Sequence, residues 1–251
     1  MGRAKDIIVA PIDAKRSFDF VREHHYTHSV KTNAQVHFGV FLDGKLGGAM
    51  QFGPPIDRHK TAALVRNTKP RGMLELNRMA FTDDLPRNSE SRALGVVMRL
   101  MRKELPTIRW VVSFADATQC GDGTIYRAAG FMLTAIRKNA TVLRMPDGST
   151  AFDKTLKNRA RYGDLAAARR AGARPMLGYQ MRYVYFLDPS AIGDLTVEPV
   201  PYSAIKDMGA AMYRGQRVGS IGDDAACIPA GGGRCNSDPD APSVHARQGV
   251  R

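Results

Sequence analysis

The fold is decided by the segment Arg109–Asp116, whose sequence is RWVVSFAD. Its apolar run is nearly continuous, which is typical of a strand buried on both faces of an α/β sheet. In open α/β sheets ligands bind beyond the carboxyl ends of the strands, and Asp116 stands at that end. The segment therefore predicts a central strand with a polar group at its functional end.

Helices are expected on both sides of this strand along the chain. Before it, PRNSES at 86–91 precedes a helix whose apolar residues recur at helical spacing, with Asn88 or Ser89 as the cap. After it, Gly123–Ala129 reads as a short helix that ends at Gly130. The start of the longer helix offers free backbone N–H groups, which suit either a pyrophosphate or an ordinary capped helix.

Further elements complete a mixed sheet. Asp43-Gly44 supplies the positive φ of a tight hairpin between two apolar runs. Strands are expected at 7–12, 35–42, 46–52, 73–81, 132–136 and 179–187, and a first helix at 14–23. This order predicts an α/β fold with a mostly antiparallel mixed sheet and helices on both faces.

The charge is strongly positive for a chain of this length. The 251 residues carry a net charge of +13, and the part from Lys206 onward, with six basic and five acidic residues, contributes +1 of it. The remaining +12 lies on residues 1–205, so the folded part attracts polyanions. Nucleic acid, an anionic membrane surface or a phosphorylated cofactor would each suit it.

The domain plan is one catalytic domain at 1–205 followed by a flexible tail at 206–251, which is rich in Gly, Pro, Ser and Asp. No apolar stretch reaches the roughly 20 residues of a membrane span, and no secretory segment is evident, so we expect a cytoplasmic protein. The three cysteines, Cys120, Cys227 and Cys235, predict no structural disulfide. With His245 they also lack the paired spacing of a zinc site.

Candidate chemistry begins with His24-His25-Tyr26-Thr27-His28, a dense polar cluster after the first helix. Histidine, tyrosine and Asp116 could supply mixed N and O ligands to iron, manganese or zinc, or a catalytic base. The alternative is a surface loop together with an Asp that caps the next turn.

Tyr126 lies in the short helix Tyr126-Arg127-Ala128-Ala129-Gly130, which resembles the corresponding helix of GNAT acetyltransferases. In those enzymes a tyrosine commonly protonates the departing thiolate, and a phenol suits this because its pKa lies near that of an alkyl thiol. The alternative is a packing tyrosine whose hydroxyl is hydrogen-bonded.

Three segments resemble the Mom family of phage adenine-modification proteins. They are Glu75–Phe81 (ELNRMAF), PRNSES at 86–91 and Ser113–Asp116 (SFAD); His25-Tyr26 and the helix with Tyr126 fit as well, so the likeness covers about residues 5–190. The resemblance implies conversion of DNA adenine to its N6-carbamoylmethyl form, which shields phage DNA from host restriction. It also implies an acetyltransferase-like fold, an acetyl-CoA-like cofactor and bound iron.

The resemblance carries roles to individual residues. His25, Tyr26 and Asp116 would form the catalytic and iron site, and Tyr126 would take part in catalysis. Arg78 and Ser91 would contact the coenzyme, beside the cap-region residues Asn88, Ser89 and Arg92 that the helix start already suggests. The phosphate loop is poorer in glycine than in ordinary acetyltransferases.

A basic insertion at about 153–174 is expected to be helical and to contact double-stranded DNA. Its candidate phosphate contacts are Lys154, Lys157, Arg159 and Arg161, and the alternative is a solvated helix face. Two other functions stay open. A conventional acyl-CoA-dependent N-acetyltransferase would need neither iron nor this insertion, and a DNA-binding protein without catalysis would leave the His, Tyr and Asp cluster unexplained.

Overall fold

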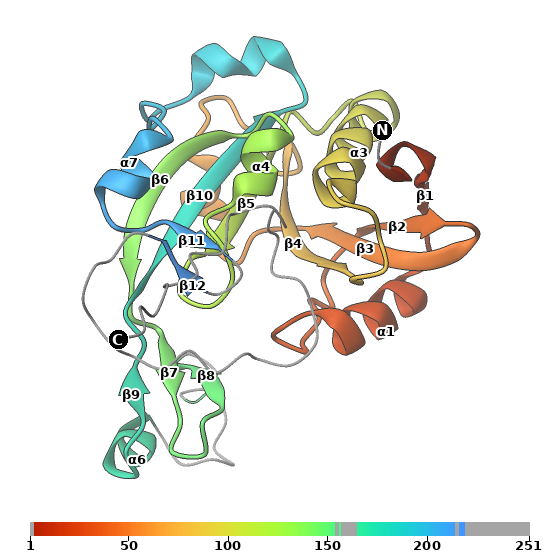
Figure 1. The fold of residues 1–251 in the computed structure, drawn as a ribbon. Coiled ribbons are helices and arrows are strands. Elements are labelled where there is room, and N and C mark those ends of the chain that lie inside the picture. The colour runs from red at the N-terminus through yellow and green to blue at the C-terminus, as the bar shows by residue number, and fades with distance from the viewer. Residues whose placement is uncertain (1–2, 154–155, 157–164, 214–215, 219–251) are drawn as a thin grey trace, which may run out of the picture.

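The computed structural model describes residues 3–153, 156, 165–213 and 216–218 (Figure 1). Its helices are η1 (Arg3–Asp6), α1 (Ala14–His24), α2 (Arg58–Ala62), α3 (Ser89–Glu104), α4 (Thr124–Ala128), α6 (Leu165–Arg170), η3 (Pro189–Asp194) and α7 (Ser203–Asp207). Its strands are β1 (Ile8–Pro11), β2 (Val36–Leu42), β3 (Lys45–Gly53), β4 (Met73–Phe81), β5 (Trp110–Asp116), β6 (Met132–Asn139), β7 (Val142–Arg144), β8 (Thr150–Phe152), β9 (Arg174–Pro175), β10 (Gly178–Phe186), β11 (Met212–Tyr213) and β12 (Gln216–Arg217).

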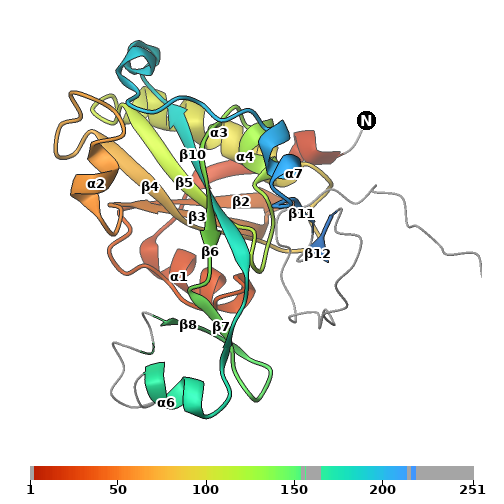
Figure 2. The same cartoon turned by 90° about the vertical axis from the view of Figure 1, so that its left-hand side faces the viewer.

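Seven strands form one mixed sheet in the order β1-β2-β3-β4-β5-β10-β6. Every neighbouring pair is antiparallel except β4 and β5, which run parallel. Helix α1 packs on β2, β3 and β4 from one side, while α3 and α4 lie together on the other side (Figures 1 and 2). The expected α/β fold, with a mostly antiparallel sheet and helices on both faces, is confirmed.

Local signals place several of these elements. Asp43 and Gly44 both have positive φ, 50° and 77°, so the hairpin between β2 and β3 forms where the Asp-Gly step predicted it. Helix α1 begins after Asp13, whose side chain accepts a hydrogen bond from the Arg16 N–H at 2.8 Å. Helix α3 begins after Asn88, but the Asn88 side chain makes no capping hydrogen bond.

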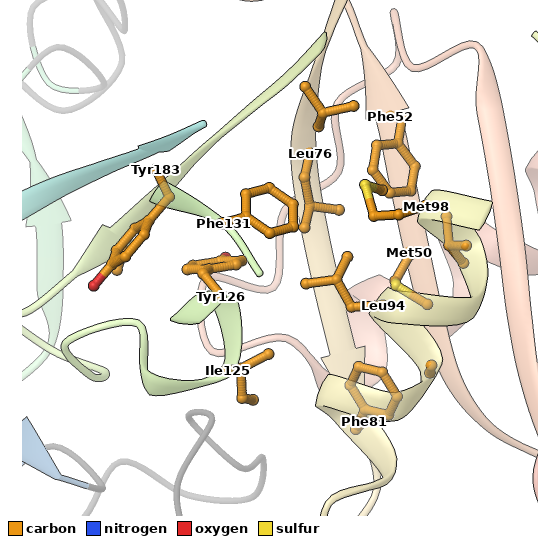
Figure 3. Packing of buried hydrophobic residues seen from close by; sticks show 14 of the residues in the cluster. Met50, Phe52, Leu76, Phe81, Leu94, Met98, Ile125, Tyr126, Phe131 and Tyr183 are labelled. Atoms are coloured by element: carbon orange, nitrogen blue, oxygen red, sulfur yellow. The ribbon is translucent and has the colours of Figure 1, made fainter. Parts of the chain in front are cut away.

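The main core lies between the sheet and the α3–α4 side. Leu94, Val97 and Met98 of α3 are fully buried against β3 and β4, and Tyr126 and Phe131 continue the cluster toward β10 (Figure 3). A second cluster lies on the other face of β5 and contains Trp110 and Val112. Strand β5 is therefore covered on both faces over its first half, as its apolar run predicted.

Strands β4 and β5 separate after three paired positions, from Met73 opposite Trp110 to Glu75 opposite Val112. Beyond this point β4 also carries a bulge, because Gln51 of β3 faces Arg78 while the next residue, Phe52, faces Leu76. Asn77 is the extra residue of the bulge. It turns Arg78 to the α1 side of the sheet while Leu76 stays on the α3 side.

Two regions differ from the sequence prediction. Strands β7, β8 and β9 form a small second sheet that was not expected, and of the predicted helical insertion the structure describes α6 (Figure 1). Packing also continues past residue 205, because Ala210 and Met212 are buried in the main core. No helix in the described ranges is both long and apolar enough to cross a membrane.

Candidate active site

A pocket opens where β4 and β5 separate. Its wall is built from the loop after α1, the second half of β4, the end of β5 and the start of α4. The empty space within and in front of this wall is about 690 Å³, a volume that includes open solvent. Its lining includes His25, Tyr26, Arg78, Asp116 and Tyr126, so the structure brings these five predicted residues together.

His25 is held in one orientation by the loop that follows it. Its Nδ1 accepts a hydrogen bond from the Thr27 backbone N–H at 3.1 Å and lies 2.9 Å from Thr27 Oγ1. Burial, followed by the positive charges of Arg78 and His28, lowers the pKa of His25 to about 3. The imidazole is therefore neutral, and because Nδ1 is an acceptor the single ring proton lies on Nε2.

Tyr26 stacks on the His25 ring, with centroids 4.4 Å apart and planes 27° from parallel. Burial and the nearby charge of Asp116 raise the pKa of the Tyr26 phenol, so it keeps its proton and acts as a donor.

Arg78 fastens the loop to β4. Its Nε donates to the Ser29 carbonyl oxygen at 2.9 Å, its Nη2 reaches Ser29 Oγ at 3.2 Å, and its Nη1 donates to the Asn77 carbonyl oxygen at 2.7 Å. The bulge at Asn77 aims this side chain at the loop. Arg78 thus orients His25 and Tyr26 as well as placing a positive charge in the pocket, whereas its predicted contact with a coenzyme stays a prediction.

Asp116 lies where β5 ends, and both of its carboxylate oxygens are engaged. Oδ1 accepts from the Thr118 backbone N–H at 3.0 Å, and Oδ2 accepts from Gln119 Nε2 at 3.1 Å. The carboxylate therefore stabilises the turn after β5, and it also faces the pocket. The two sequence interpretations of Asp116, a turn cap and a reactive group, are compatible.

Tyr126 is buried, and its ring packs 5.2 Å from Tyr183 and 5.6 Å from Phe131 (Figure 3). Burial raises the pKa of its phenol, and the negative charge of Glu75 adds to this. The phenol is therefore a proton donor at neutral pH. Tyr126 is a packing residue whose position also reaches the pocket.

The predicted coenzyme contacts other than Arg78 lie at the start of α3. Ser91 Oγ donates to the Asn88 carbonyl oxygen at 3.3 Å, and Arg92 Nη2 donates to the Lys5 carbonyl oxygen at 3.4 Å. Ser89 is fully buried, and its hydroxyl has no hydrogen-bond partner within the described part of the chain. An uncapped helix start beside an unused hydroxyl fits an anionic group such as a phosphate.

The donor set does not fit the expected iron. Among the described residues no three His, Cys, Asp or Glu side chains are grouped so that they could hold a metal ion. A metal on His25 Nε2 would need the ring proton on Nδ1, where the Thr27 N–H already points.

Other predictions fall outside the pocket or outside the described residues. Cys120 lines the pocket and is disulfide-bonded, which corrects the expectation of no disulfide; its partner lies outside the described residues. The expectation rested on an odd number of thiols, which does not prevent one pair from forming. The candidate DNA contacts Lys154, Lys157, Arg159 and Arg161 also lie outside the described residues, as do Cys227, Cys235 and His245.

Sequence reasoning missed several residues of the site. Asn77 forms the bulge, Ser113 faces Tyr126, and Phe114 lines the pocket while 36% exposed. Glu75 is half-buried near the site, and desolvation raises its pKa. Two signals were available: the pair Asn77-Arg78 within the otherwise largely apolar strand β4, and an aromatic residue two positions before the end of β5.

Comparisons with known proteins agree with one another on the family. A model of the Mom protein family matches residues 6–204. The methylcarbamoylase Mom of Escherichia phage Mu is 32% identical over 192 residues, which is 75% of this chain and 78% of that protein.

Solved structures with a similar chain path are acetyltransferases. The ribosomal-protein-S18-alanine N-acetyltransferase of Escherichia coli has a TM-score of 0.41 and 11% identity, over 72% of this chain and 94% of that chain. A GNAT family acetyltransferase from Elizabethkingia anophelis, solved with acetyl-CoA bound, has a TM-score of 0.38 and 12% identity, over 72% and 98%.

Proposed function

The chain belongs to the Mom protein family, and from this premise we propose that it transfers a carbamoylmethyl group to N6 of adenine in DNA. The family relative from phage Mu is named a methylcarbamoylase, which supports the nature of the group. DNA adenine as the acceptor is what the sequence resemblance implies, and the net charge of +13 suits a DNA substrate. Such a modification would shield phage DNA from restriction enzymes that read unmodified adenine.

One observation carries the proposal: a single pocket combines two proton donors with a carboxylate. His25 Nε2–H and the Tyr26 hydroxyl are donors, and Asp116 is the acceptor. Adenine offers the complementary pattern, since its ring nitrogens accept hydrogen bonds and its amino group donates them. The pocket is therefore suited to hold adenine by its edge.

The transfer requires one proton to leave N6. A bond forms between N6 and the methylene carbon of the carbamoylmethyl group, the bond from that carbon to its donor breaks, and an N6–H bond is lost. Asp116 is the residue we assign to accept this proton, because its carboxylate lines the pocket while His25, Tyr26 and Tyr126 all carry protons. We assign Tyr126, whose protonated phenol lines the pocket, to protonate the leaving group.

Access to N6 requires the adenine to leave the base stack. The amino group of a stacked base is hard for a pocket to surround, and extrusion costs a few kcal/mol. The pocket lies at the open ends of β4 and β5 rather than inside the sheet, so an extruded base could enter it.

An acyl-coenzyme-A-type donor is the cofactor that we propose. The start of α3, with Asn88 uncapped and the Ser89 hydroxyl buried without a partner among the described residues, would hold its phosphates. When bound, the coenzyme would supply an acyl group activated at its carbonyl carbon, so the transfer to N6 requires a co-substrate that carries its leaving group on the methylene carbon of the carbamoylmethyl group. No step is assigned to iron, because the donor set does not fit it.

Mass spectrometry of nucleosides from DNA of expressing cells tests the function. The wild-type protein should yield N6-carbamoylmethyl-deoxyadenosine, and Asp116→Asn should lower its amount about 100-fold or more, because a positioned base contributes that much. Asn keeps an oxygen for the Thr118 N–H, so the fold should persist.

Asp84→Asn is the matched control, since Asp84 is an exposed carboxylate bonded to Lys45. It should leave the yield unchanged. Unmodified DNA in cells that express folded wild-type protein would refute the proposal, and acetylated amines or proteins in the same cells would favour a conventional N-acetyltransferase. A fully active Asp116→Asn would remove Asp116 from its role.

A further inference from the structure

Part of the large sheet is uncovered beside the pocket. Phe114 of β5 lies opposite Arg182 of β10, and Gln180 of β10 lies opposite both Asp116 and Arg137 of β6. Residues directly opposite one another on antiparallel strands point to the same side of a sheet. We call the surface formed by Phe114, Gln180, Arg182 and Arg137 the open face.

The open face continues a side of the sheet that is covered elsewhere. Two residues before Phe114, Val112 is fully buried in the second core cluster, and Val184 is buried in the same way two residues after Arg182. Phe114, by contrast, is 36% exposed, and Gln180 and Arg137 are exposed as well. The covering layer therefore stops at the level where the pocket begins.

Phe114 joins the open face to the pocket. It is one of the few large apolar side chains that the described residues leave exposed, and it is also part of the pocket lining. Leaving a phenyl ring in water has a free-energy cost, and a base stacked on it would remove that cost. Every base has a π face, so such stacking accepts an adenine brought out of the duplex.

The open face carries positive charge without a carboxylate to neutralise it. Arg182 donates from Nε to Thr134 Oγ1 at 2.9 Å and from Nη2 to the Thr134 carbonyl oxygen at 3.1 Å, so its head is fixed by uncharged groups. Burial and then the charge of Arg137 lower the pKa of Arg182, so the two guanidinium groups repel each other. Within the described residues neither forms an ion pair.

A polyanion is the partner that this charge pattern fits. Asp116, a carboxylate on this side at the pocket, is bonded to Thr118 and Gln119 rather than to either arginine. The positive surface extends to the small sheet and α6, where the exposed arginines are Arg169, Arg170 and Arg174. The small sheet and α1 both lie on the side of the large sheet away from α3 (Figures 1 and 2).

We propose that the open face is the surface on which DNA is held while its adenine occupies the pocket. Phe114 stacks on the extruded base, and Arg182 and Arg137 bind phosphates of the same strand. Adjacent strands are roughly 4.8 Å apart. The backbone of Arg182 therefore lies one strand away from Phe114 across the sheet, and the backbone of Arg137 lies two strands away. The inference rests on the proposed function for the identity of the base.

Binding measurements on the full chain test the phosphate contacts. The probe is a duplex oligonucleotide with one mismatched adenine, and the dissociation constant is measured at several salt concentrations. Arg137→Gln should lower the slope of log K against log salt by about 1, as expected for the loss of one phosphate contact. Arg99→Gln is the matched control, because it removes one exposed charge from α3 on the opposite side of the sheet, and it should leave the slope unchanged.

The stacking contact is tested with the same probe. Phe114→Ala should weaken binding about 10-fold without changing the salt slope, because base stacking on an aromatic ring contributes that much. Phe114→Tyr should restore most of the affinity. Circular dichroism of each variant checks that the fold is intact, which is expected because Phe114 and Arg137 are exposed.

Two results would overturn the inference: equal salt slopes for Arg137→Gln and Arg99→Gln, or normal affinity of Phe114→Ala. Its failure is distinguishable from failure of the proposed function. If the wild-type protein modifies adenine but the variants bind normally, the open face is refuted and the enzyme assignment stands. If the variants lose binding as expected but no modified nucleoside forms in cells, the DNA surface stands and the proposed reaction is refuted.

Discussion

At the scale of single residues, a backbone N–H decides what His25 can do. The Thr27 N–H points at Nδ1, so the neutral ring must carry its proton on Nε2 and present a donor to the pocket. Burial beside the charge of Arg78 keeps the ring neutral, with a pKa of about 3. A histidine at the surface would titrate near neutral pH, so it could act either as a proton donor or as a proton acceptor.

This lowered pKa predicts a dependence of stability on pH. Between about pH 6.5 and pH 3 the unfolded chain binds a proton at His25 and the folded chain does not, so the free energy of unfolding falls as the pH falls through this range. From pH 7.5 to pH 5.5 the loss should be about 1.4 kcal/mol from this residue. The contribution of His25 to the free energy of unfolding is complete at about pH 7.5, one unit above the unfolded pKa of 6.5.

Denaturant unfolding of the wild-type protein and of His25→Gln at about pH 7.5 and about pH 5.5 measures this pH dependence of the free energy of unfolding. Gln is uncharged, and its side-chain oxygen can accept the Thr27 N–H, so the variant should lack this part of the pH dependence. A variant with the same pH profile as the wild-type protein would show that His25 is not held neutral.

At the scale of elements, the start of β10 sets the turn after β5. A Cβ atom at Gly178 would lie 2.3 Å from Thr118 Oγ1 and 2.6 Å from Thr118 Cα, so only glycine fits there. Thr118 in turn donates its N–H to Asp116 and accepts a hydrogen bond from Asn139 at 3.1 Å. The position of the Asp116 carboxylate therefore depends on close packing between two strands.

Gly178→Ala should lower both stability and activity. The added methyl must push the Thr118 backbone away, which costs about 1–3 kcal/mol for an overpacked site and displaces the Asp116 carboxylate. Gly193→Ala is the control, because a Cβ there meets nothing within 4 Å. Thermal unfolding and nucleoside yield measure the two effects, and equal results for the two variants would mean that the turn tolerates displacement.

At the scale of the whole molecule, one core joins distant parts of the chain. The main cluster contains Ile7 near the N-terminus and Met212 near the end of the described chain. The Asp122 N–H donates to the Met212 carbonyl oxygen at 3.3 Å, and Tyr179 Oη donates to the Met208 carbonyl oxygen at 2.8 Å. Residues 206–212 thus contact both the loop before α4 and strand β10.

Met212→Ala should therefore destabilise the whole domain. Met212 is 5% exposed, and truncation of a buried methionine costs about 2–5 kcal/mol. Met208→Ala is the matched control, since Met208 is 43% exposed and should change the free energy of unfolding by less than about 0.5 kcal/mol. Denaturant unfolding measures both changes. If Met212→Ala left the free energy of unfolding unchanged, the segment around Met212 would not unfold together with the domain, and the predicted domain end at residue 205 would be supported.

Much of the fold was predictable from the sequence because its signals are local. The positive φ at Asp43 and Gly44 follows from residue type, and the bounds of β4 and α1 follow from the period of apolar residues. The sequence also pointed to His25, Tyr26, Asp116 and Tyr126, partly from residue type at strand and helix ends and partly from resemblance to the Mom family.

Only the tertiary structure decided how these residues behave. Several features depend on strand pairing, on burial or on what covers a surface. They are the bulge at Asn77, the proton position on His25, the exposure of Phe114 and the disulfide at Cys120. The physical reason is that strand pairing, burial and desolvation act between segments, whereas turn geometry and periodicity act within one segment.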